Sequence, residues 1–166
     1  MIHKKVLLID GNFHNPQISE QGRPDNYLED YLRSGKEGLL FPSHEQSFVV
    51  LGNEGGDVSL LEAGSHEVPV ATKLELLKSR FDVILVEVPA LEQQDKAKEW
   101  LRFADKVVAT FKSGTTIGSA DQEHIAYLAE GGNKTAGWIF NRVAYRPAKQ
   151  RPGRTNASKK TKKLAA

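Results

Sequence analysis

Apolar residues gather along this chain in short runs of four to seven residues that are hydrophobic at nearly every position. The runs are rich in Val, Ile, Leu and Phe, and polar or turn-forming residues bound them, which predicts buried β-strands. The predicted strands are residues 6–10, 47–51, 58–61, 82–88, 106–111 and 135–140. Strands that are apolar on both faces are typical of a parallel sheet covered on both sides.

Between these runs, apolar residues recur three and four positions apart, as on one face of an amphipathic helix. In residues 70–80, for example, Val70, Leu74 and Leu77 share a face. The predicted helices are residues 26–34, 70–80, 93–104 and 119–130, the last with Ser119 as its N-cap. Strands that alternate with helices predict an α/β domain with a mostly parallel sheet and helices on both faces.

Charge divides the chain near residue 145. Residues 146–166 hold eight Lys and Arg, two Pro and no acidic residue, whereas residues 1–145 hold 15 basic and 21 acidic residues, a net charge of −6. A segment with so few apolar residues cannot bury enough surface to fold alone, so we predict a domain at 1–145 and a basic disordered tail at 146–166. The tail's charges predict attraction to an anionic membrane surface, and its lack of aromatic residues argues against a nucleic-acid arm.

Composition excludes several classes of protein. No apolar run approaches the roughly 20 residues of a transmembrane helix. The chain has no Cys, which excludes disulfides and thiolate metal ligands and fits a reducing cytoplasm.

Two of the predicted strands carry an acidic residue at or near their ends. Asp10 closes residues 6–10 with Asn12 in the turn behind it, and Glu87 lies near the end of residues 82–88. Because ligands of parallel sheets bind at the carboxyl ends of the strands, these three side chains are candidate Mg²⁺ ligands, directly or through water. The residues alone leave open the alternative that they simply begin solvated loops.

Phosphate binding has a weaker basis. No stretch of the chain matches the phosphate-loop signature G-x-x-x-x-G-K-[ST]. The loop 112–116 follows a strand and precedes a helix, which suits an anion site, but its single Gly is equally typical of an ordinary connection. His14, beside the Asp10 turn, is a further candidate acid or base.

The order of these segments resembles that of the bacterial tyrosine kinases (BY-kinases), the cytoplasmic ATPase domains of polysaccharide co-polymerases. KKVLLIDGNFHNPQIS resembles their Walker A′ segment, and NYLEDYLRSGKE the helix that follows it. FDVILVEVPAL is similar to the Walker B strand, and ADKVVATFKSGTTIGSADQEHIAYLAEGGNKTAGWIFNRV to the closing strand–helix–strand unit. The similarity runs in order through about residues 4–145. ATPases of the ParA/MinD type share the architecture.

The resemblance implies a P-loop NTPase-like fold of the SIMIBI (ParA/MinD) type, with ATP and Mg²⁺ as cofactors. By position, Asp10 matches the Walker A′ acid near Mg²⁺ and the attacking hydroxyl, and Glu87 takes the place of the Walker B Asp. Asn12 stands where the family has a second Asp, and His14 where it has Arg. Asn141 matches the strand-end Asn that contacts the adenine.

The family's first strand, its P-loop and the helix after it have no counterpart in these 166 residues. Phosphoryl transfer depends on positioning and charge stabilisation, so we expect little or no kinase activity from this chain alone. The loss of a central strand also predicts open edges on its neighbours, which invite pairing with another chain.

We therefore expect a fragment, a split product or a pseudoenzyme that acts as a regulatory or interaction module in capsular or exopolysaccharide biosynthesis. Its expected place is the cytoplasm, peripheral at the inner membrane, and its expected partners are a membrane-bound polysaccharide co-polymerase, a P-loop-bearing protein or a second copy. One alternative is a ParA/MinD-like ATPase completed by a partner, with the tail contacting membrane or DNA. The other is an α/β binding module for a ligand that is not a nucleotide.

Overall fold

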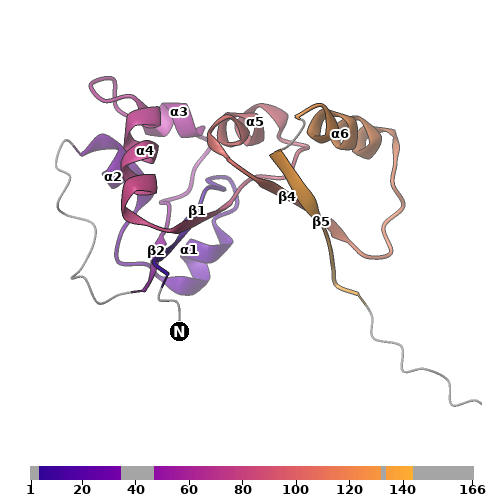
Figure 1. Cartoon of the computed structure of the whole chain (residues 1–166), viewed down its shortest axis with the longest axis horizontal. Coiled ribbons are helices and arrows are strands. Elements are labelled where there is room, and N and C mark those ends of the chain that lie inside the picture. Colours follow the sequence, from indigo (N-terminus) through magenta and orange to yellow (C-terminus); the bar gives the residue numbers. More distant parts are fainter. Residues whose placement is uncertain (1–3, 35–46, 132–133, 144–166) are drawn as a thin grey trace, which may run out of the picture.

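The computed structural model describes residues 4–34, 47–131 and 134–143. Strands and helices alternate along these residues, which confirms the α/β class (Figure 1). The strands are β1 (Val6–Asp10), β2 (Phe48–Leu51), β3 (Val83–Glu87), β4 (Val107–Lys112) and β5 (Thr135–Asn141). The helices are α1 (Gln17–Gly22), α2 (Leu28–Arg33), α3 (Leu60–Ala63), α4 (Val70–Arg80), α5 (Gln94–Phe103) and α6 (Ser119–Glu130).

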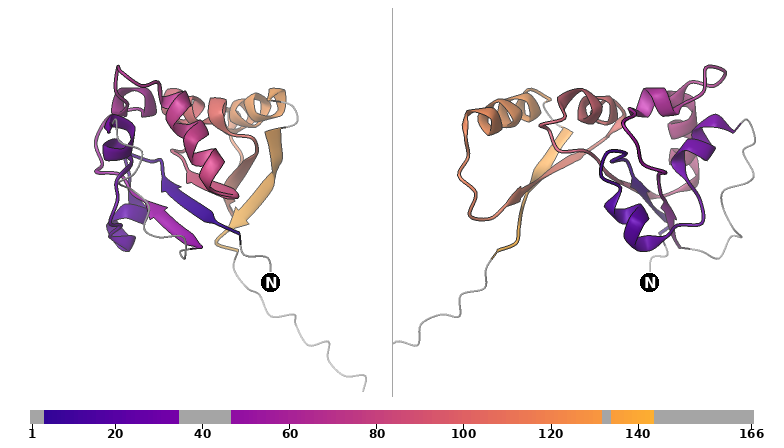
Figure 2. Two further views of the ribbon diagram at one scale, coloured as in Figure 1. Left: turned by 60° about the vertical axis from the view of Figure 1, so that its left-hand side comes forward. Right: turned by 180° about the vertical axis from the view of Figure 1, so that it is seen from behind.

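The strands form two sheets instead of the single sheet that the sequence predicts. One has the order β2-β1-β3 and the other pairs β4 with β5, and every one of these pairings is parallel. The two sheets are separated between β3 and β4, which do not pair with each other. Helix α5 connects these two strands, as in a βαβ unit. The described part of the chain is therefore built in two halves, which Figure 2 shows from two further sides.

Most of the hydrophobic core lies in the half that contains the β2-β1-β3 sheet and its helices. Leu7 and Ile9 of β1 are fully buried, and Leu77 of α4 and Trp100 of α5 pack in the same cluster. Among the described residues that follow Phe103, Leu128 is the one buried hydrophobic side chain. Both helices that flank β4 and β5, namely α5 and α6, lie on the same side of these strands (Figures 1 and 2). Within the described residues, no helix lies on the opposite side of β4 and β5, where the sequence predicts helical cover (Figures 1 and 2).

Two predicted elements differ from the structure. Residues 58–61 were expected to form a strand, but Ser59 begins helix α3 instead. The side-chain oxygen of Ser59 accepts a hydrogen bond from the Glu62 backbone N–H (3.3 Å), and the Glu62 carboxylate accepts one from the Ser59 N–H (2.7 Å). This capping box stabilises the start of a helix, so the segment is helical despite its apolar run. At α6, Gly118 occupies the N-cap position that was expected for Ser119.

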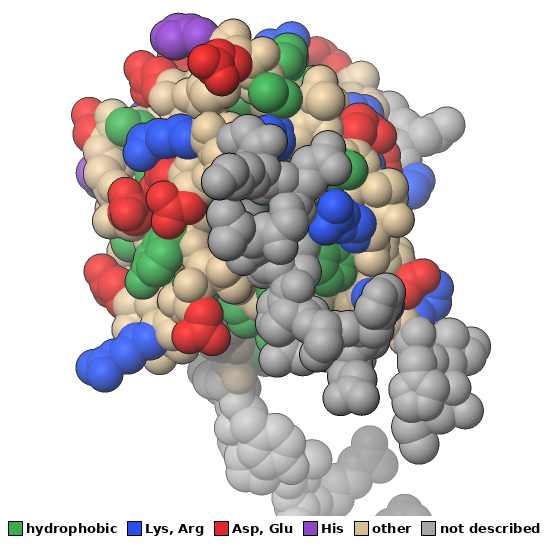
Figure 3. Space-filling view, turned by 90° about the vertical axis from the view of Figure 1, so that its left-hand side faces the viewer, with side chains coloured by type: hydrophobic (Ala, Val, Ile, Leu, Met, Phe, Trp, Pro, Cys, Tyr) green, Lys and Arg blue, Asp and Glu red, His purple; other side chains and the backbone are tan. Residues whose placement is uncertain are grey.

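The surface at the α2–α4 end of the molecule is mixed in charge. Figure 3 shows acidic and basic side chains interspersed there, with small apolar areas between them where grey atoms do not cover the view. No helix in residues 4–34, 47–131 and 134–143 is both long and apolar enough to cross a bilayer. The predicted tail, 146–166, lies outside the described residues.

Candidate functional site

The carboxylate of Asp10 is buried in the turn that follows β1. Its side chain is 0% exposed. Its Oδ2 accepts hydrogen bonds from the backbone N–H of Ser19 (2.8 Å) and from the Ser19 hydroxyl (2.7 Å). Its Oδ1 accepts one from the backbone N–H of Asn12 (3.3 Å). Both carboxylate oxygens thus accept hydrogen bonds from the protein. The two bonds from Ser19 hold α1 against the end of β1.

Three further contacts fix the same turn. The side-chain amide of Asn53 donates to the Asp10 carbonyl (2.9 Å), and the Asn53 backbone N–H donates to the Ser19 hydroxyl (2.8 Å). The Trp100 indole donates to the Gly11 carbonyl (3.0 Å). A Cβ atom on Gly11 would come within 2.7 Å of the Glu87 carbonyl, so only glycine fits between β1, β3 and α5 here.

Glu87 lies beside Asp10, in register with it across the β1–β3 pair. Its carboxylate accepts a hydrogen bond from the Asn12 side-chain amide (3.4 Å), whose own oxygen accepts the backbone N–H of Asn15 (3.2 Å). Desolvation by surrounding protein atoms raises the pKa of Glu87, the Asn12 hydrogen bond opposes this rise, and repulsion from Asp10 adds to it.

The structure therefore brings together the three predicted Mg²⁺ ligands, Asp10, Asn12 and Glu87. However, Asp10 and Asn12 are buried, whereas Glu87 is exposed and is the accessible member of the set. Within the described residues, no cluster of three or more His, Cys, Asp or Glu is placed to hold a metal ion. Mg²⁺ takes several oxygen ligands in near-octahedral geometry, and of these three residues only Glu87 is exposed. The metal role of the three residues and the catalytic role of Asp10 stay predictions.

Asn141, the predicted adenine contact, lies in the other half of the molecule. It ends β5, in register with Lys112 of β4. Its side-chain oxygen accepts the backbone N–H of Arg142 (2.7 Å), and its carbonyl accepts the N–H of Ser113 (2.7 Å). The bond to Ser113 ties β5 to the start of the 112–116 loop, and the contact with adenine stays a prediction.

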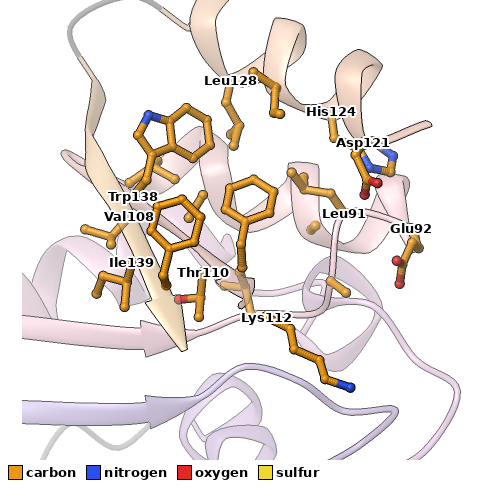
Figure 4. A pocket seen from close by; sticks show the side chains of 18 of the residues that line it. Leu91, Glu92, Val108, Thr110, Lys112, Asp121, His124, Leu128, Trp138 and Ile139 are labelled. Carbon is orange, nitrogen blue, oxygen red and sulfur yellow. The ribbon is translucent and has the colours of Figure 1, made fainter. Parts of the chain in front are cut away.

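A cavity of about 1000 Å³ lies between the two halves. Its walls include the last residues of β3, all of β4 and the inner face of α6. Its lining is largely apolar, and the ring of Trp138 lies near Leu128 of α6 (Figure 4). The Phe111 ring packs against the Trp138 ring at a tilt of 41°, with ring centroids 5.4 Å apart. At one end Figure 4 shows Glu92, Asp121 and His124 together.

His14 borders a second, polar hollow of about 530 Å³. Asp57 and Lys96 form an exposed ion pair in its wall, and the hydrogen bond from Lys96 holds the pKa of Asp57 below its usual value. Glu92 and Asp95 complete an acidic lining. His14 therefore has charged neighbours in this hollow. Its role as an acid or base stays a prediction.

Sequence reasoning missed Ser19 and Asn53, which hold the Asp10 turn in place, and the hydrogen bond from the Trp100 indole to the Gly11 carbonyl. Asn53 follows the apolar strand β2 as Asp10 ends β1, so the same criterion of polar residues behind strands could have found it. Nothing in the sequence marks Ser19. Comparison of the chain with family models, with curated proteins and with solved structures found no match.

Proposed function

We propose that this chain is a BY-kinase-like domain that acts as a regulatory or interaction module in capsular or exopolysaccharide biosynthesis and export. It works in the cytoplasm, peripherally at the inner membrane, beside a membrane-bound polysaccharide co-polymerase. It does not transfer phosphate by itself. The pathway rests on the sequence resemblance, because an α/β fold alone supports many functions.

The hydrogen bonds to the Asp10 carboxylate carry the proposal that the chain does not transfer phosphate by itself. The resemblance assigns this acid to the metal and the attacking hydroxyl, yet its oxygens accept hydrogen bonds from Ser19 and Asn12 in the interior. A buried carboxylate used in this way supports the fold, which favours a structural role for Asp10 over a catalytic one. The chain also carries no phosphate-loop signature to hold the transferred charge.

Calorimetric titration of the full chain with Mg-ATP tests the proposal. We expect no binding tighter than about 1 mM and no phosphorylation of Tyr residues by mass spectrometry after incubation with Mg-ATP. Asp10→Asn serves as the control once circular dichroism shows that it stays folded, since any binding that the folded variant lacks belongs to the Asp10 turn. Binding tighter than about 10 μM, or phosphorylated Tyr, would overturn the claim that the chain is inactive alone.

One observation favours a second function, that of an ATPase completed by a partner. Glu87 reaches the cavity between β3 and β4, so a phosphate loop entering there would lie beside the Asp10 turn. ATP hydrolysis by a mixture of this chain with a P-loop-bearing fragment would separate the two functions. Hydrolysis by the mixture that exceeds the sum of the two separate components supports the completed ATPase.

A further inference from the structure

Two open strand edges border one cavity. Among the described residues, β3 pairs only with β1, and β4 pairs only with β5. The last three residues of β3 and all six residues of β4 line the cavity of about 1000 Å³. Because strands joined by a βαβ connection run parallel, one strand of the same direction would pair with β3 on one side and with β4 on the other.

An apolar sheet face continues on both sides of the same gap. Leu85 of β3, Val108 of β4 and Ile139 of β5 are 52%, 52% and 53% exposed. Ile84, next to Leu85, packs against the core, and Trp138, next to Ile139, lies on the side of Leu128 in Figure 4. Since side chains alternate along a strand, the three exposed residues lie on the face away from α5 and α6.

We propose that a partner polypeptide inserts a parallel apolar β-strand between β3 and β4 and lays an amphipathic helix, which follows that strand, over Leu85, Val108 and Ile139. The inference rests on the proposed role as an interaction module, but not on its place in polysaccharide export. The strand would join two sheets into one, and the helix would give that sheet the second covered face that parallel sheets have.

The topology favours this occupant over others. A strand added at the outer edges, β2 or β5, would pair on one side only, whereas a strand in the gap pairs on both and fills the cavity. All five described strands of a second copy are already paired, so inserting any of them would break a pairing. Residues 146–166 carry eight Lys and Arg, and burying these charges in an apolar gap is costly.

The charges at one end of the gap indicate the chemistry of the partner. Glu87, Glu92 and Asp121 line the cavity together with Lys112 and His124, so acidic side chains outnumber basic ones. A partner with a basic residue in the turn between its strand and its helix would complement this acidic rim.

A synthetic strand–turn–helix peptide provides the probe. It carries a strand of about six Val and Ile residues, a turn with Lys, and an amphipathic helix of about four turns. We expect calorimetry to show binding to the full chain, and hydrogen exchange to show slower exchange of the amides of β3 and β4, with β2 and β5 unchanged. A peptide with Glu in the turn should bind more weakly, by an amount that falls with salt.

Matched variants locate the site. Leu85→Lys should weaken peptide binding about tenfold or more, because a charge would lie beneath the docked helix. Leu61→Lys is the control, since Leu61 on α3 is 47% exposed and lies outside the cavity lining, and it should leave binding within about twofold. Circular dichroism checks that both variants fold.

Absence of binding, equal losses in both variants, or protection confined to β2 or β5 would overturn the inference. A dimer of the chain alone that Leu85→Lys dissociates would also overturn it, in favour of a second copy. Tight Mg-ATP binding would instead contradict the proposed function and leave the peptide result standing, so the two failures are distinguishable.

Discussion

At the scale of single residues, Asp10 shows how an acid in a motif-like position serves the fold. Asp10→Ala would leave the Ser19 N–H and hydroxyl without their buried acceptor. We expect a loss of about 2–4 kcal/mol in the free energy of unfolding, measured by urea denaturation. Glu130→Ala, at an exposed position, should change it by less than about 0.5 kcal/mol. A loss at Asp10 that appears only with Mg²⁺ present would point to a metal role instead.

Glu29 gives a pH-dependent prediction. Its buried carboxylate accepts the Glu54 N–H through Oε1 (3.0 Å), and its Oε2 has no hydrogen-bond partner among the described residues. Burial raises its pKa above the ordinary value of 4.5, and its backbone hydrogen bonds oppose the rise. Because the folded pKa is raised, the stability that the protonated form contributes is complete below about pH 4.5 and is lost as pH rises through the folded value.

Glu29→Gln keeps an acceptor for the Glu54 N–H and removes the charge. We therefore expect the variant to be more stable than the parent chain at pH 7, with a difference that shrinks as pH falls to 4.5 and below. Urea unfolding at a series of pH values measures it. Glu123→Gln, on the exposed side of α6, should show no such trend, and a pH-independent difference at Glu29 would contradict the explanation.

At the scale of elements, the sequence predicted those whose signal is local. Residues 6–10 and 70–80 match β1 and α4 in both bounds, because a continuous apolar run and a 3.6-residue period are visible within each segment. The strand predicted at residues 58–61 was wrong, because the Ser59–Glu62 capping box begins a helix there despite the four-residue apolar run. The short helix α1 escaped prediction, since its position depends on Asp10, nine residues from Ser19.

The candidate site was also predictable only in part, from features that are local in the sequence. Asp10 and Glu87 were expected together because parallel strands end at one edge, and their register places them side by side. That the carboxylate of Asp10 is engaged was not predictable, because its main partner, Ser19, comes from the unpredicted helix α1. The sequence thus predicted which residues meet, but not which of them remain accessible.

The junction of β1, β3 and α5 depends on one glycine. A methyl group on Gly11 would approach the Glu87 carbonyl to 2.7 Å and the Trp100 ring to 2.8 Å. We expect Gly11→Ala to lower the free energy of unfolding by about 1–3 kcal/mol through overpacking, measured by urea denaturation. Gly22→Ala is the control, because its Cβ would meet nothing within 4 Å, and it should be neutral or slightly stabilising. Equal effects at the two glycines would contradict the packing argument.

At the scale of the whole molecule, burial is uneven. The three-stranded sheet has a core that includes Leu7, Leu51 and Leu77, while Val108, Ile139 and Phe140 of the second sheet are exposed. Apolar strands with one covered face match the composition of a complete α/β sheet and not of a two-stranded one. Of these residues, Val108 and Ile139 lie on the side of the second sheet that the proposed partner helix would cover.

The opposite charges of residues 1–145 and 146–166 lead to a prediction for the full chain. Eight basic residues near an anionic bilayer each contribute up to about 1 kcal/mol, whereas the net charge of −6 on residues 1–145 is repelled. We expect the chain to sediment with phosphatidylserine vesicles at low salt and to be released at about 0.15 M salt, where the screening length is about 8 Å. Replacing Lys159, Lys160, Lys162 and Lys163 with Gln should remove most of the binding, and neutral vesicles should bind neither protein. Binding that survives both the substitutions and the salt would assign membrane contact to the apolar face around Leu85 instead of to the basic segment.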